Sequence, residues 1–136
     1  MIASMNTLLI ALLLTAATGM AATTKAQQSS SDSEKALVHT VFFWFHDGVS
    51  EADSQNFYEE LKKLQQIPQI RHGWIGVPAD TEERGVIDSS YDYSITFVFD
   101  DEKAEHEYQV HPIHTEFVET NSHLWDKVTV YDAVTP

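Results

Sequence analysis

Residues 108–117, Tyr-Gln-Val-His-Pro-Ile-His-Thr-Glu-Phe, carry one phenol and two imidazoles around a proline. Proline cannot continue a helix from its N-terminal side, but it suits the first turn of a new helix. The stretch therefore predicts a short helix that ends near Val110 and a second helix that starts at Pro112. We expect this break to place Tyr108 and His114 at the rim of one pocket. The alternative is that the proline forms a corner and the histidines only pack and cap.

The segments on either side of this stretch show the periodicities of strands and helices. Four segments are rich in β-branched and aromatic residues and predict strands at 38–45, 70–77, 91–99 and 125–133. Ser50 has the chemistry of a helix cap, and apolar residues follow it at helical spacing as far as Pro68. A short helix capped by Asp100 or Asp101 precedes the proline. The resulting β-α-β-β-α-β order predicts the α+β class, with a ferredoxin-like subunit and one antiparallel sheet.

The predicted sheet is apolar on both faces, although two helical regions can cover only one of them. In segment 38–45, apolar side chains occupy both the odd and the even positions, so both faces of this strand are largely apolar. In segment 91–99 one face is strongly apolar and is formed by Tyr91, Tyr93, Ile95, Phe97 and Phe99. An uncovered apolar sheet face usually marks an interface. We therefore predict a homodimer in which two sheets face each other and close a dimeric α+β barrel.

The first 36 residues differ in composition from the rest of the chain. Residues 1–26 contain an apolar run followed by small residues, which is typical of a signal peptide. Residues 27–36 form a serine-rich polar linker, and residues 37–134 form the domain. An exported protein, periplasmic or secreted, without a stable membrane anchor is expected. Because no Lys or Arg precedes the apolar run, an uncleaved anchor stays open as an alternative.

Composition limits the classes of partner. The chain has 136 residues and a formal net charge of −13. Phosphate binding needs concentrated positive charge, so nucleic acid and anionic membranes are not expected partners. The sequence has no cysteine, which excludes disulfides and thiolate nucleophiles. It also has no glycine-rich phosphate loop, so no nucleotide cofactor is expected. Haem binding stays open because the chain has seven histidines, although no residue marks such a site.

Three motifs resemble one known family. They are Val38-His39-Thr40-Val41, Phe45-His46-Asp47-Gly48-Val49-Ser50, and Tyr108-x-x-His111-Pro112-x-His114-x-x-Phe117. Together they resemble the stress-responsive A/B-barrel (Dabb) family over about residues 37–134. The resemblance implies a dimeric α+β barrel whose ferredoxin-like subunits each hold a cavity between sheet and helices.

The same resemblance implies roles for individual residues. The family includes a plant polyketide cyclase, olivetolic acid cyclase, whose catalytic Tyr and His match Tyr108 and His114. Its strand histidine matches His39, and its pocket tryptophan matches Trp125. Tyr93 stands where that enzyme has a second pocket histidine, and Leu61 roughly replaces an aromatic residue, so the resemblance implies the fold but leaves the substrate open. The implied ligand contacts are His39, Val41, Phe43, Tyr93, His111 and Trp125.

Two functions from different classes follow from these residues. The first is a binding domain for a small apolar or aromatic molecule, with no established catalysis. The second is a cofactor-free cyclase or isomerase in which His114 takes a proton and Tyr108 holds the developing enolate. His39 has an alternative role as a hydrogen-bonded core histidine. A metal site built on His111-x-x-His114 has no third ligand in a fixed position, so no metal is expected.

Overall fold

The computed structural model describes residues 35–136 of the chain. The predicted signal peptide and all but the last two residues of the linker lie outside the described residues. The four strands are β1 (Leu37–Phe45), β2 (His72–Gly76), β3 (Tyr93–Phe99) and β4 (Trp125–Val134). The α-helices are α1 (Glu51–Leu64), α2 (Glu102–Gln109) and α3 (Pro112–Asn121), and a 3-10 turn at Ser122–Leu124 leads into β4.

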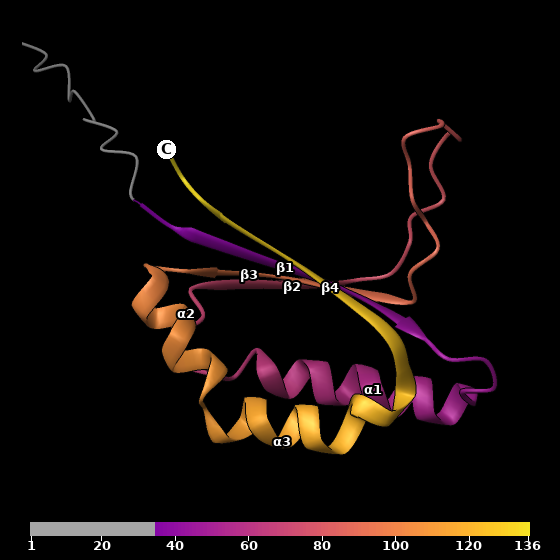
Figure 1. Cartoon of the computed structure of the whole chain (residues 1–136), viewed down its shortest axis with the longest axis horizontal. Coiled ribbons are helices and arrows are strands. Elements are labelled where there is room, and N and C mark those ends of the chain that lie inside the picture. The colour runs from indigo at the N-terminus through magenta and orange to yellow at the C-terminus, as the bar shows by residue number, and fades with distance from the viewer. Residues whose placement is uncertain (1–34) are drawn as a thin grey trace, which may run out of the picture. The chain divides into compact units, whose positions relative to one another are not determined.

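The strands form one antiparallel sheet in the order β2-β3-β1-β4. All three α-helices lie on one side of this sheet, and the long loop between β2 and β3 extends from the opposite side (Figure 1). This is the predicted α+β, ferredoxin-like subunit. Within residues 35–136 no helix has the length and apolar character needed to cross a membrane.

The proline stretch folds as its chemistry predicts. Helix α2 ends at Gln109, and α3 begins at Pro112 with His111 as its N-cap. The Nδ1 atom of His111 accepts a hydrogen bond from the backbone N–H of Ile113 at 3.2 Å. This bond satisfies one of the amide groups that a helix start leaves unpaired. The break therefore turns the chain between α2 and α3 and sets Tyr108 and His114 on either side of the corner.

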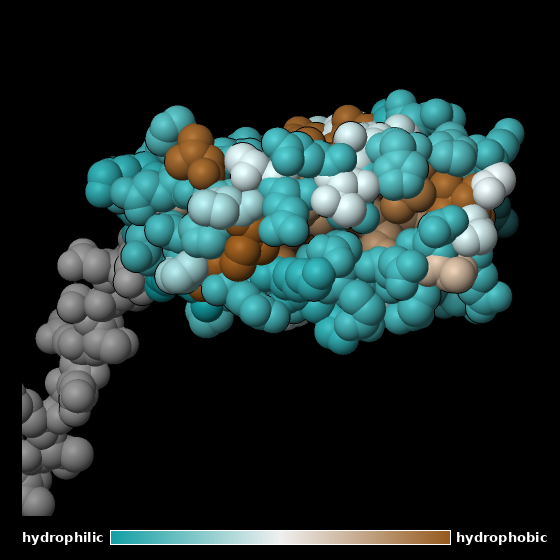
Figure 2. Space-filling view, turned by 90° about the horizontal axis from the view of Figure 1, so that it is seen from below, coloured by the Kyte–Doolittle hydropathy of each residue, from teal (hydrophilic) through white to brown (hydrophobic). Residues whose placement is uncertain are grey.

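The core lies between the sheet and the helices and is unusually aromatic. Phe57 of α1 is fully buried at the centre of this core. Its ring meets those of Phe43 and Phe45 at centroid distances of 5.2 and 5.0 Å, and that of Phe117 at 5.5 Å. The exterior of the helical layer is mostly hydrophilic, with separate apolar patches (Figure 2).

The opposite face of the sheet carries exposed aromatic side chains. Trp74 and Tyr131 are 59% and 62% exposed and lie in one row across the sheet, and the Phe42 ring of β1 packs against that of Tyr131 at 6.3 Å. The prediction that Tyr91 shares the buried face is wrong, because its ring packs against Phe42 at 4.9 Å. The carboxylate of Asp92 accepts a bond from the backbone N–H of Phe45 at 2.6 Å, so regular alternation begins only after it.

Candidate functional site

A cavity of about 120 Å³ lies between the sheet and the α2–α3 corner. Most of its wall is apolar or aromatic, which favours a ligand of the same character. Two polar side chains, Tyr108 and His114, enter it from the helical side, and His39 enters from the sheet. The other lining residues include Val41, Phe43, Leu64, Ile95, Phe117, Val118, Trp125, Val128 and Val130.

His114 is held by the corner that precedes it. Its Nδ1 lies 3.0 Å from the carbonyl oxygen of Gln109, the last residue of α2. A carbonyl oxygen can only accept, so Nδ1 carries the proton and donates it. This tautomer leaves Nε2 with a free lone pair. Burial lowers the pKa of His114, and the Gln109 carbonyl only partly opposes this shift. The imidazole is therefore neutral near pH 7 and has the electronic form of a base.

Tyr108 has the complementary character of a donor. It is 1% exposed, and its ring lies 4.6 Å from that of His114, centroid to centroid. Burial raises the pKa of Tyr108, and the nearby carboxylate of Glu105 adds to the shift. The phenol therefore keeps its proton at any physiological pH. No hydrogen bond joins its hydroxyl to any residue from 35 onward, so this donor is available to a ligand oxygen.

His39 is bound to the neighbouring strand. It stands directly opposite Asp132 in the β1–β4 pairing, and its Nδ1 lies 2.6 Å from a carboxylate oxygen of that residue. Its ring packs edge-on against Tyr108 at 5.9 Å and Phe99 at 6.2 Å. The expected core role is thus visible in the hydrogen bond, and the same ring also forms part of the cavity wall. The sequence pattern did not point to Asp132.

Two of the expected ligand contacts do not line this cavity. His111 caps α3 through its own ring, so its Nδ1 is already used. Tyr93 is separated from the cavity by Phe57, whose ring lies 5.5 Å from Tyr93 on one side and 5.5 Å from Phe117 on the other. The hydroxyl of Tyr93 instead lies 3.2 Å from that of Ser54. The remaining expected contacts, His39, Val41, Phe43 and Trp125, all lie on the wall.

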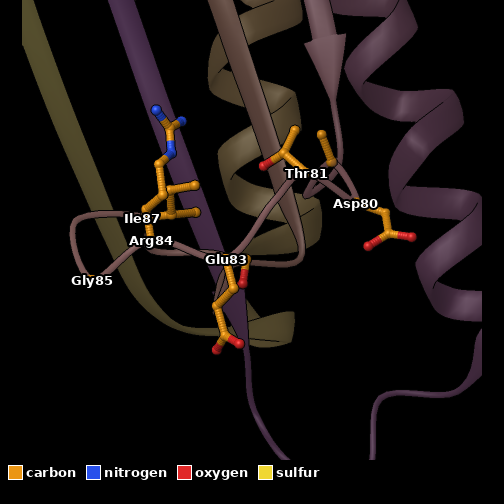
Figure 3. A pocket seen from close by; sticks show the side chains of 8 residues that line it. Asp80, Thr81, Glu83, Arg84, Gly85 and Ile87 are labelled. Atoms are coloured by element: carbon orange, nitrogen blue, oxygen red, sulfur yellow. The ribbon is translucent and has the colours of Figure 1, made fainter.

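Two larger hollows exist, but polar side chains do not converge in them as they do in the α2–α3 cavity. Tyr93 lines a groove of about 330 Å³ with residues of α1 and β2. The β2–β3 loop encloses a wide hollow of about 650 Å³, lined by polar residues such as Asp80, Glu83 and Arg84. The side chains of these three residues point in different directions and do not converge on one place (Figure 3). The α2–α3 cavity is therefore the candidate site, because its polar groups do converge.

The family comparison agrees with this geometry. The sequence model of the stress-responsive A/B barrel domain matches residues 37–135. The chain belongs to the stress-responsive A/B-barrel family. The match covers every strand and helix described above, including the corner that carries Tyr108 and His114. No curated protein matches the chain.

Solved structures share the fold of this A/B-barrel domain. A dimeric ferredoxin-like protein of unknown function from Thermobifida fusca YX is 20% identical, with a TM-score of 0.62, and the match covers 74% of this chain and 92% of that one. A Dabb family protein from Mesorhizobium loti MAFF303099 is 24% identical, with a TM-score of 0.62 and coverage of 75% and 98%. The hydroxynitrile lyase of Passiflora edulis is 16% identical, with a TM-score of 0.64 and coverage of 76% and 95%. Identities this low establish the fold alone.

The lowered pKa of His114 predicts a pH dependence of stability. Between its folded pKa and its ordinary value near 6.5, the folded chain binds fewer protons at His114 than the unfolded chain does. Stability that is present above about pH 6.5 is therefore lost as the pH falls through this range. We expect His114→Gln to reduce the difference between urea midpoints measured at about pH 7.5 and about pH 5. Equal differences in the variant and the parent would contradict the assignment.

Proposed function

We propose that this A/B-barrel domain binds a small apolar or aromatic molecule that carries an oxygen acceptor. The observation behind the proposal is the convergence of Tyr108 and His114 in a cavity whose other walls are mostly hydrocarbon. The apolar wall favours ligand burial, and the unpaired Tyr108 hydroxyl supplies one oriented hydrogen bond. A carbonyl or hydroxyl oxygen on the ligand satisfies that donor.

The volume of the cavity limits the size of the ligand. An engineered apolar cavity of about 150 Å³ holds benzene. The cavity here, of about 120 Å³, is slightly smaller, so it limits the ligand to one ring with a small substituent at most. Its opening is bordered by Val118, Val128 and Val130, which are 38%, 37% and 47% exposed, so the entrance is apolar as well. A long folded chain of ketones needs more room than this conformation provides.

Titration of the purified chain with benzaldehyde, followed by ligand-observed NMR, tests the binding proposal. We expect Val118→Trp to abolish binding, because an indole at the entrance fills the cavity. Tyr108→Phe should weaken binding about tenfold, since one hydrogen bond is lost while the ring stays. Val86→Trp is the matched control, because Val86 is 91% exposed on the β2–β3 loop. Equal binding by the parent, Val118→Trp and Val86→Trp would refute the site, as would no binding by the parent to any single-ring carbonyl compound.

A second candidate is an acid–base enzyme, and the tautomer of His114 favours it. With Nδ1 bonded to the Gln109 carbonyl, Nε2 can take a proton from a carbon next to a carbonyl group. Tyr108 then donates to the oxygen as the enolate forms. Exchange of the methyl protons of acetophenone in D₂O, followed by NMR, measures this step directly. Exchange above the buffer rate that is lost in His114→Gln supports an enzyme, and exchange at the buffer rate supports a binding domain.

Two further features belong to this proposal. We propose that the domain functions as a homodimer, as the solved structure from Thermobifida fusca is described to be. Export through the leader at residues 1–26 remains a prediction from the sequence, because that segment lies outside the described residues. The net charge of −13 repels nucleic acid but does not hinder the binding of a small neutral molecule.

A further inference from the structure

A cluster of three potential metal ligands lies at one end of the cavity, where the sequence pattern suggested none. His39, Glu105 and Asp132 come from β1, α2 and β4, and each offers one ligand atom. These atoms all lie within 4.8 Å of one another. We propose that the three side chains form a binding site for a divalent first-row metal ion, with zinc as the best fit.

The ligand atoms lie close enough together to bind one metal ion after small movements of the side chains. Zinc lies about 2.0–2.2 Å from imidazole nitrogen and carboxylate oxygen, which sets neighbouring ligand atoms about 3–4 Å apart. Nδ1 of His39 and the nearer oxygen of Asp132 are 2.6 Å apart and share a proton in the metal-free chain. When zinc binds, the His39 ring takes the tautomer that carries its hydrogen on Nε2, and the ion replaces the hydrogen between Nδ1 and the carboxylate oxygen. The two atoms then separate by about 0.4–1.4 Å to reach the spacing of zinc ligands.

The surroundings hold two of the ligands in place before an ion arrives. The ring of His39 is 3% exposed and is fixed by the rings of Phe99 and Tyr108. One carboxylate oxygen of Glu105 accepts a bond from the side-chain amide of Gln109 at 2.7 Å. Such outer hydrogen bonds orient metal ligands and raise affinity. The Glu105 carboxylate is therefore oriented by its own helix, and its other oxygen remains to bind a metal.

Access and charge also favour a cation at this place. The side chain of Asp132 is 47% exposed, so an ion can enter from solvent. Two carboxylates balance the charge of a divalent ion, and the net charge of −13 attracts it. Imidazole favours zinc over magnesium and calcium. Three protein ligands leave a further position for water or for a ligand oxygen from the adjoining cavity.

The pair of histidines that the sequence suggested is less suitable. Nδ1 of His111 accepts the Ile113 amide, and Nδ1 of His114 donates to the Gln109 carbonyl. Both rings would have to give up these bonds, or bind only through Nε2. Within the part of the chain that the structure describes, the cluster of His39, Glu105 and Asp132 is the group with the required spacing.

Calorimetric titration of the chelator-treated full chain with ZnCl₂ tests the proposal. We expect one zinc ion per chain, with affinity at least tenfold lower in Glu105→Gln and in Asp132→Asn. Matched controls are Glu102→Gln on the same helix and Asp126→Asn on the same strand, both exposed, which should bind as the parent does. Glu105 and Asp132 are not core residues, so their variants should fold, which circular dichroism checks.

Titration with cobalt(II) provides a second readout, which is spectroscopic rather than calorimetric. The visible absorption bands of the bound ion report the ligands, and they should change in His39→Gln and in Glu105→Gln but not in Glu102→Gln. Zinc bound equally by the parent, Glu105→Gln and Asp132→Asn would show adventitious surface binding and overturn the proposal. No zinc binding by the parent would overturn it too. The benzaldehyde titration of the metal-free chain is a separate measurement, because its variants change Tyr108 and Val118.

Discussion

Replacing Phe57 by alanine is expected to lower the free energy of unfolding by about 3–5 kcal/mol. The side chain is fully buried, and its ring contacts those of Phe43, Phe45, Phe117 and Tyr93. Truncation leaves a cavity that this interlocked group of rings cannot close by moving one member. A loss of this size is a large part of the stability of a typical domain.

Urea denaturation measures this effect through the midpoint, with the slope m unchanged if the unfolded state is unaffected. Val86→Ala is the control, since Val86 is exposed on the loop and should change stability by less than about 0.5 kcal/mol. A loss below about 1 kcal/mol for Phe57→Ala would mean that the aromatic core repacks freely. The same variant removes the ring between the cavity and Tyr93, so larger aromatic aldehydes should bind better than they do to the parent.

The sequence predicts the parts of this molecule that depend on local chemistry. The helix break follows from the missing amide hydrogen of Pro112, and the structure places it between Gln109 and Pro112. The buried face of β3 follows from alternation, and Ile95, Phe97 and Phe99 are all buried. In the third predicted strand, Asp92 illustrates the limit. Its carboxylate binds the β1 backbone, and the strand begins only after it, at Tyr93. A hydrogen bond from one side chain to another strand leaves no periodic pattern in the sequence.

The candidate site is only partly predictable, because its wall is assembled by packing between distant elements. Tyr108 and His114 are close in sequence, so their approach follows from the corner itself. Asp132 meets His39 only through the register of β1 with β4, which spans most of the domain. Glu105 joins them because of the way α2 lies on the sheet. No pattern within one segment carries these relations, so sequence reasoning could propose His39 but could not find its partners.

Replacing both Trp74 and Tyr131 by aspartate is expected to convert the protein from a dimer to a monomer. Both side chains are more than half exposed on the sheet face that the helices leave uncovered (Figure 1). Buried aromatic residues at the centre of an interface often contribute about 2 kcal/mol or more each, and a homodimer contains both positions twice, so the dimer should weaken by at least roughly a thousandfold. Because neither side chain supports the core of its own subunit, the monomer should keep its helices and strands.

Sedimentation at micromolar concentration distinguishes the two states, and the parent should run as a dimer. Val110→Asp is the matched control, because Val110 is 61% exposed but lies at the α2–α3 junction on the helical side. That variant should remain dimeric, which excludes a general effect of added charge. A parent that sediments as a monomer would contradict the homodimer, because a second copy of the chain would then not cover the exposed aromatic face. The thermal midpoint of the parent should rise with protein concentration, whereas that of the double variant should not.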